Sequence, residues 1–266
     1  MRAGKWKENM NLKGKWNLIV LLTTLVMSAM LMVWLVMDAP SQAEITVIAH
    51  AREKKILVSE YPESLIRLLE RNPETEEFVL NYPFRQSQVT DLTGYDLSQG
   101  VPLLMQWDQR WGYMDYGGSM VGITGGGPLC LSMAGYYLTG DVRFYPGSVV
   151  RYAIDNGYYT TGDADGWALI SQGAQGLGLE VKEVAPAQDK ITQYLRAGYV
   201  IIAVMGPGDF GDSSQCVVLT GCKDGVVTVN DPNSYVNSGS EWDYNTFAGQ
   251  VSRLWVVKAA AAETAN

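Results

Sequence analysis

The sequence predicts an α+β fold, in which a helical half is followed by an antiparallel sheet, behind one N-terminal transmembrane helix. Three observations support this prediction. An uncharged run fills residues 18–37, helical patterns fill most of 128–196, and β-rich runs dominate from 199 to 257. Helices first and strands afterwards is the order typical of the α+β class.

The composition indicates a folded, acidic domain. Of the 266 residues, 47% are hydrophobic, which is enough for a core and argues against global disorder. Five basic residues and one acid precede residue 18, so the remaining 15 basic and 27 acidic residues carry a formal charge of −12. Phosphate backbones and anionic lipid surfaces repel such a domain, and we expect no nucleic-acid partner.

Residues 18–37 (LIVLLTTLVMSAMLMVWLVM) form an uncharged run of 20 residues. As a helix this run would span ~30 Å, the thickness of a hydrocarbon core. Basic residues gather in 1–17, and the fourteen residues after the run contain no Lys or Arg. The positive-inside rule therefore predicts a single-pass protein of the cell membrane, with 1–17 in the cytoplasm and the C-terminal domain extracellular. The alternative is a cleaved signal peptide, because Ser41-Gln42-Ala43 fits a small-x-small cleavage site.

The exported part divides into four segments. Residues 38–60 are polar and weakly patterned, which predicts a stalk, and the single histidine, His50, is expected to be solvated there. Residues 61–99 predict a helical lead-in and a polar connection, because apolar side chains form one face of a helix that ends at Asn72-Pro73. The main domain covers 100–258, and a disordered tail is expected over 259–266.

The main domain shows helical patterns and then strand patterns. The predicted helices cover 128–138, 146–156, 167–177 and 189–196. The predicted strands cover 199–205, 215–220, 226–230 and 251–257. Lys223-Asp224-Gly225 fits a hairpin turn between two of these strands.

Three cysteines, Cys130, Cys216 and Cys222, are too few and wrongly spaced for a disulfide framework or a zinc site. We expect mostly buried thiols, with one bridge at most. Asp163 and Asp165 suggest a calcium loop, but the distal Glu of such a loop is absent. We therefore expect no metal and no cofactor.

Four ordered motifs, VPLLMQWDQRWGYMDYGG, GITGGGPLCLSMAGYYLTGD, QCVVLTG and VNDPNS, carry a resemblance to a known family. Together they resemble the exported, bacterial, family thirty-nine-like cysteine peptidase domain, a relative of double-glycine leader peptidases. The resemblance covers roughly residues 100–257 and implies a papain-like fold. The lead-in is similar to the segment that precedes this domain in Gram-positive members.

The resemblance also implies which positions would carry catalysis. The family's nucleophilic cysteine matches Gly126, and its histidine matches Gln215. The residue that orients the histidine matches Asp231, and the oxyanion-stabilising glutamine matches Gln106, so these two are retained. A thiolate mechanism needs a base beside the thiol, and a Gln side chain cannot accept a proton near neutral pH. The pattern implies a degenerate member, a pseudopeptidase with neither nucleophile nor base.

Several functions remain open for such a scaffold. The first hypothesis is a domain that binds an extracellular peptide or protein, for which the candidate ligand-binding residues are Gly125, Gly126, Gly127, Gln215 and Trp107. The second is an assembly protein whose old cleft is unused. The third hypothesis is a different chemistry. One form of it is hydrolysis by an unrecognised nucleophile, for which the candidates are Thr124, Cys130 and Cys216. The other form is a site that binds cell-wall glycan through Trp107, Trp111, Tyr113 and Tyr116. For Cys130 and these aromatics, packing in the core is the simpler expectation. Strand alternation is expected to turn Cys216 to the face opposite Gln215.

Overall fold

A six-stranded antiparallel sheet forms one half of the domain in this computed structural model, which describes residues 16–17, 20–30, 32–33, 39–86, 92, 95–159 and 167–261. The strand order is β3-β8-β4-β5-β6-β7. The strands are β3 (Leu179–Glu183), β4 (Val200–Met205), β5 (Gln215–Lys223), β6 (Val226–Asn230), β7 (Trp242–Asp243) and β8 (Val251–Ala259). The four predicted strands are present, whereas the short edge strands β3 and β7 were not predicted.

The hairpin between β5 and β6 turns as the sequence predicts. Asp224 and Gly225 both adopt positive φ angles, 52° and 82°. Two successive residues with positive φ give a turn whose twist matches that of the paired strands.

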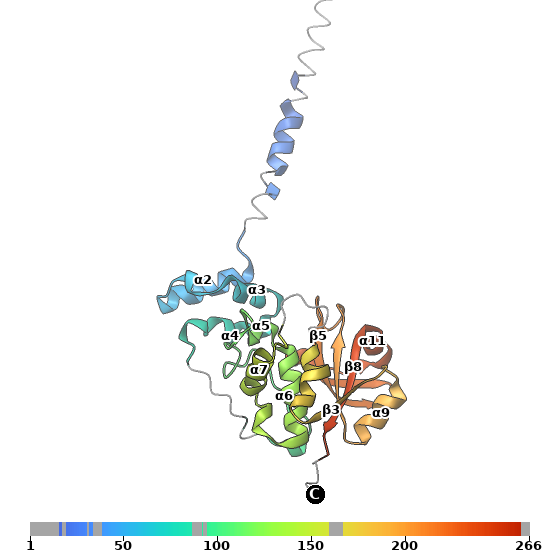
Figure 1. Ribbon diagram of the computed structural model, residues 1–266. Coiled ribbons are helices and arrows are strands. Elements are labelled where there is room, and N and C mark those ends of the chain that lie inside the picture. The colour runs from blue at the N-terminus through green and yellow to red at the C-terminus, as the bar shows by residue number, and fades with distance from the viewer. Residues whose placement is uncertain are drawn as a thin grey trace, which may run out of the picture.

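Helices cover both faces of the sheet, which explains why every residue of the central strand β4 is buried. Figure 1 shows α6 and α7 on one side of the sheet and α9 and α11 on the other. The helices of the first side are α6 (Gly126–Thr139), α7 (Pro146–Asp155), a π-helical turn (Leu169–Gly173) and α8 (Ala174–Gly176). On the other side lie α9 (Gln188–Arg196) and α11 (Tyr244–Gln250). The short helix α10 (Tyr235–Ser238) follows β6 and has no buried residue. The α+β class is thus confirmed.

The strand alternation divides the core into two clusters. Cys216 and Val218 of β5 belong to the cluster that contains α6, together with Ile202 and Val204 of β4. Val217 of β5 belongs to the cluster on the opposite face, which the side chains of α9 and α11 complete. This alternation decides which β5 side chains face the start of α6.

The segment expected to be a stalk is structured instead. Residues Gln42–Lys54 form α2, which begins with a capping box between Ser41 and Glu44. Its small side chains pack into a third cluster with α3 (Glu63–Arg71) and α4 (Glu76–Leu80). The His50 ring is half-buried and meets Phe84 edge-on, so it is not the solvated stalk residue that was expected. This helix was not predicted because its buried face consists mainly of alanines, so the hydrophobic periodicity of the sequence is weak there.

The lead-in is fastened to the sheet half of the domain. Asn72 Nδ2 donates to Asn233 O at 2.7 Å. The Glu74 carboxylate accepts from Ser234 Oγ at 2.6 Å and from the Tyr235 backbone N–H at 2.7 Å. These bonds hold the end of α3 against the loop that follows β6.

Four predictions concern segments that are described only in part or not at all. Within the described ranges, no helix has the length and apolar character that a membrane crossing needs. The predicted span 18–37 lies partly outside those ranges, and most of the tail 1–17 lies outside them. Residues 160–166, with the considered calcium loop, also lie outside them. Of the tail predicted over 259–266, Ala259 is instead the last residue of β8, and residues 262–266 lie outside the described ranges.

Candidate functional site

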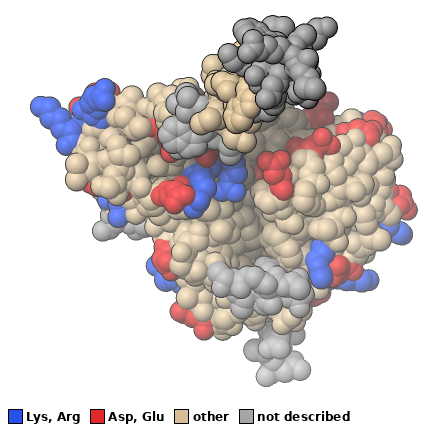
Figure 2. Space-filling model, turned by 90° about the horizontal axis from the view of Figure 1, so that it is seen from above, with Lys and Arg blue, Asp and Glu red and all other residues tan. Residues whose placement is uncertain are grey.

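A cavity of about 780 Å³ lies where the start of α6, the β4–β5 loop and the end of α3 meet. Figure 2 shows the corresponding face of the molecule, which is hollowed between its two halves. From the helical half, the lining residues are Tyr116, Ile123, Thr124, Gly126, Gly127, Pro128, Tyr158, Tyr159 and Trp167. The remaining lining residues are Leu68, Arg71, Asn72, Gln106, Gly208, Asp209, Gly211 to Cys216, and Asn233.

The three glycines at the start of α6 have different roles. A Cβ on Gly125 would lie 2.4 Å from Val121 O, so this position needs glycine to fit its own backbone. A Cβ on Gly127 would make an ordinary 3.5 Å contact with the Trp167 ring. Gly126 and Gly127 line the cavity as expected, whereas Gly125 lies behind it and shapes the turn.

Gly126 faces two side chains across the floor of the cavity. A Cβ at this position would lie 3.4 Å from Gln106 Oε1 and 3.7 Å from Cys216 Cβ. Gln106 is buried, and its Nε2 donates to Asn233 Oδ1 at 3.1 Å and to Gly122 O at 3.3 Å. The atom of Gln106 that faces position 126 is therefore an acceptor, whereas the oxyanion role implied by the resemblance needs a donor.

Cys216, rather than Gln215, faces the start of α6. The two side chains point to opposite faces of β5, as alternation predicts, but Cys216 is the one that belongs to the α6 cluster. Gln215 lines the cavity from the side of the β4–β5 loop, where its Nε2 donates to Ser213 Oγ at 3.4 Å. The register expected from the resemblance therefore differs by one residue from the side chain that approaches Gly126.

Asp231 is bound within its own loop. The side chain is 1% exposed, its Oδ1 accepts from the Asn233 backbone N–H at 2.8 Å, and its Oδ2 accepts from Asn237 Nδ2 at 2.7 Å. Burial raises the pKa of Asp231 to about 6, although these hydrogen bonds oppose the shift. No hydrogen bond recorded between described residues joins Asp231 to Gln215, so the retained acid shapes the loop that carries Asn233.

The cysteines are buried thiols, as expected. Cys130 and Cys216 pack in the same buried cluster, which contains α6. Burial is the main reason why the pKa of Cys130 lies well above its ordinary value. A thiol that holds its proton this firmly is a poor nucleophile.

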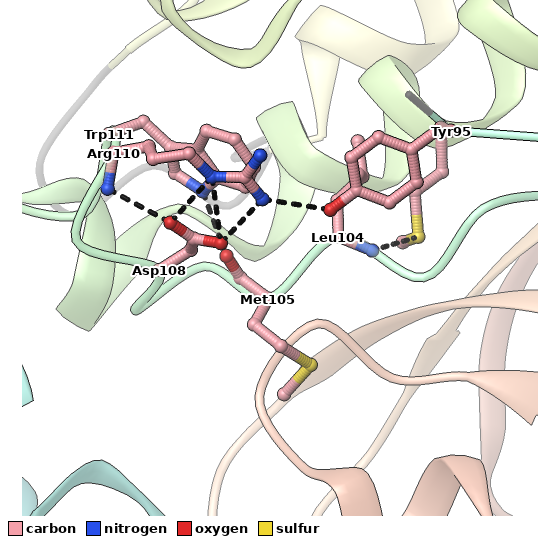
Figure 3. A network of polar contacts seen from close by, with 7 residues as sticks. Tyr95, Leu104, Met105, Asp108, Arg110 and Trp111 are labelled. Atoms are coloured by element: carbon pink, nitrogen blue, oxygen red, sulfur yellow. Dashed lines mark hydrogen bonds and ion pairs between the residues drawn. The ribbon is translucent and has the colours of Figure 1, made fainter. Parts of the chain in front are cut away.

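The aromatic residues considered for a glycan site are buried or half-buried among other side chains. Figure 3 shows Trp111 in a network in which its indole N–H donates to Met105 O at 2.8 Å and Arg110 pairs with Asp108 at 2.7 Å. The Tyr113 ring stacks on Phe78. Only Tyr116 of the four lines the cavity.

Trp107, predicted as a ligand-binding residue, is not among the residues that line the cavity. Its indole N–H donates to Asn233 O at 3.2 Å, and its ring meets Tyr235 edge-on. It therefore supports the loop after β6 rather than the cavity surface.

Several residues that line the cavity could not be predicted from the sequence. Arg71, at the end of α3, lines the cavity because the neighbouring Asn72 is hydrogen-bonded to Asn233, which lies 161 residues further along the chain. Tyr158, Tyr159 and Trp167 form an aromatic side, and Asp209 and Asp212 stand on the β4–β5 loop. No local pattern marks these residues, because they meet only through the tertiary fold.

The comparisons with known proteins found similar solved structures but no matching family model or curated protein. No family model matches the sequence, and no curated protein matches it. The chain is similar to the peptidase domain of Streptococcus ComA, a bifunctional ABC transporter involved in a quorum sensing pathway, at 17% identity and a TM-score of 0.38, over 51% of this chain and 91% of that one. It is also similar to a putative C39-like peptidase from Bacillus anthracis, at 12% identity and a TM-score of 0.41, over 61% of this chain and 96% of that one. Neither likeness carries an activity over to this chain.

Proposed function

We propose that residues 100–258 form a papain-like pseudopeptidase domain of the family thirty-nine-like type, which binds a peptide segment in the cavity without cleaving it. One observation carries this proposal. The cavity lies at the start of α6, and the residue there that faces it, Gly126, has no side chain. The single histidine of the sequence, His50, belongs to α2 and is not among the lining residues.

The chemistry of the cavity supports binding over hydrolysis. Nucleophilic catalysis by a thiol needs a neighbouring base and donors aimed at the developing oxyanion. Cys216 lines the cavity without an imidazole beside it, and Gln106 turns its oxygen toward Gly126. Thr124 also lines the cavity, but its hydroxyl donates to Met120 O at 3.3 Å. None of these residues has the surroundings of an activated nucleophile.

The size and lining of the cavity suit a peptide. Pockets that enclose small ligands have volumes of roughly 300–1,000 Å³ and combine apolar walls with a few polar groups. Here Tyr158, Tyr159 and Trp167 provide apolar surface, while Gln106 and Asn233 provide polar groups. An assembly role would leave this cavity without a ligand.

The peptide-binding proposal is tested by retention of peptides on the immobilised full-length protein. We expect a pool of random hexapeptides to be retained by wild type and by Gly126→Ala. We expect about tenfold weaker retention by Gly126→Trp, because the indole fills the floor of the cavity. An activity-based thiol probe is expected to leave wild type unlabelled. Labelling of wild type, or equal retention by all three proteins, would refute the proposal.

We also infer that the domain is exported and held at the cell membrane by residues 18–37, with the N-terminus in the cytoplasm. The uncharged run and the basic residues before it support this. In intact cells, added protease is expected to degrade the domain, and alkaline carbonate is expected to leave the full-length protein in the membrane fraction. Release by carbonate would contradict the anchor, and protection from protease would contradict the orientation.

A further inference from the structure

One wall of the cavity comes from outside the main domain. Leu68, Arg71 and Asn72, all at the end of α3, line the cavity beside Gln106 and Asn233. Among the described residues that line the cavity, Arg71 is the one with a positive charge. The lead-in therefore contributes a cation to a cavity that the two halves of the main domain otherwise form.

The Arg71 guanidinium has most of its hydrogen-bonding capacity free. Its Nε donates to Arg67 O at 3.2 Å, and no ion pair is recorded for Arg71 with any described residue. Arg67, one turn earlier on the same helix, is instead paired with Glu63 at 2.6 Å and does not line the cavity. A guanidinium presents a planar fork of N–H donors that matches both oxygens of a carboxylate.

The backbone that carries Arg71 is held in place. The next residue, Asn72, donates to Asn233 O, and its Oδ1 accepts from the Glu74 backbone N–H at 3.1 Å. Glu74 in turn accepts two hydrogen bonds from the loop after β6. A cation on a fixed backbone loses less freedom on binding than one on a mobile segment, so its contribution to affinity is larger.

The β4–β5 loop carries the opposite charge. Asp209 and Asp212 line the cavity from this loop, and Asp209 is held by Gln250, whose Nε2 donates to Asp209 Oδ2 at 2.6 Å. A ligand anion is therefore drawn toward α3 and repelled from the β4–β5 loop. This asymmetry gives a bound peptide a direction.

We propose that the cavity receives the carboxyl end of a peptide, with the terminal carboxylate paired to the Arg71 guanidinium. The proposal rests on the peptide-binding function stated above and names the chemical class of its ligand. The interior of a polypeptide offers no backbone charge to Arg71, whereas a chain end offers one carboxylate with the geometry of the guanidinium fork. The lead-in thus makes the cavity selective for chain ends.

The test compares two pools of random hexapeptides that differ only at the C-terminus, which is a free carboxylate in one and a carboxamide in the other. Both pools are applied to full-length wild type, Arg71→Gln and Arg67→Gln in detergent micelles, and retention is measured by mass spectrometry. We expect wild type to retain the carboxylate pool about tenfold more strongly, which is the effect of one charge-assisted pair. Arg71→Gln is expected to abolish the difference, and Arg67→Gln is expected to keep it.

The outcomes separate this proposal from the one on which it rests. Equal retention of both pools by wild type would overturn the carboxylate site while leaving peptide binding in place. A preference that survives in Arg71→Gln would overturn the role of Arg71. Failure of wild type to retain either pool would refute peptide binding itself, and the carboxylate site with it.

Discussion

Under oxidising conditions the Gly126→Cys variant is expected to form a disulfide between the new residue and Cys216. A Cβ at position 126 would lie 3.7 Å from Cys216 Cβ, which is within the range of roughly 3.5–4.5 Å found across disulfides. The bridge would join the start of α6 to the start of β5 and close a long loop. Because long closed loops restrict the unfolded chain most, the oxidised variant should gain up to about 4 kcal/mol in its free energy of unfolding.

Thiol titration and mass spectrometry of the unfolded, unreduced protein provide the measurement. The cross-linked variant should be lighter by two hydrogens than its reduced form and should retain only the thiols of Cys130 and Cys222. Gly126→Ser is the matched control, because it adds a side chain of similar size without a thiol. If oxidised Gly126→Cys still titrates every thiol, Cys216 does not face position 126 as described.

This geometry also affects a test of the proposed pseudopeptidase function in which a cysteine and a histidine are introduced into the cavity. A cysteine at position 126 that is bonded to Cys216 cannot act as a nucleophile, even with a histidine placed at 215. Adding Cys216→Ala would prevent this bridge, but a histidine at 215 would still lie on the face of β5 opposite to the one that meets position 126. The local hydrogen bonds of Asp231 show a further obstacle, because its carboxylate is already bound to Asn233 and Asn237.

The second large effect concerns pH and Asp231. Burial raises the pKa of Asp231 from 3.8 to about 6, and the nearby Glu74 charge adds to this shift. Between these values the folded protein keeps the proton that the unfolded chain releases. The contribution of Asp231 to the free energy of unfolding is therefore greatest at pH values below its pKa in the unfolded chain. This contribution is lost as the pH rises through its pKa in the folded protein. Relative to Asp231→Asn, the free energy of unfolding of wild type should fall by about 2 kcal/mol between pH ~4 and pH ~7.

Urea unfolding of both proteins across this pH range provides the measurement. Asp141→Asn is a useful control with the opposite sign, because hydrogen bonds from Arg143 lower the pKa of Asp141. Relative to Asp141→Asn, wild type should gain stability as the pH rises through the acid range. A difference between wild type and Asp231→Asn that stays constant with pH would show that folding does not change the pKa of Asp231, which would contradict the prediction.

Much of the fold followed from the sequence because its signals are local. The β-rich runs at 199–205 and 215–220 gave β4 and β5, and the turn at Asp224-Gly225 was visible in two residues. The sequence signal for the start of α6 was equally local, since Gly-Gly-Gly-Pro stands at the beginning of an apolar helix. The helix α2 was missed because its buried positions are filled mainly by alanine, which gives little hydrophobic contrast.

The candidate site was harder to predict because its parts come from distant segments. Sequence motifs located Gly126, Gln106 and Gln215, and all three line the cavity. They did not determine which of Gln215 and Cys216 faces α6, because a one-residue difference in register inverts the side-chain direction along a whole strand. Arg71 carried no local signal at all, since its place depends on a contact between Asn72 and Asn233.

The attachment of the lead-in also has a consequence for the order in which the molecule matures. Asn72 precedes its partner Asn233 by 161 residues, so a nascent chain makes α3 long before the loop that receives it exists. Contacts between such distant segments are among the slowest to form, because a large loop must close first. A growing chain that has already built α6 therefore still lacks one side of its cavity. The cavity is complete only when the last third of the polypeptide has been synthesised and its loop after β6 has bound the end of α3.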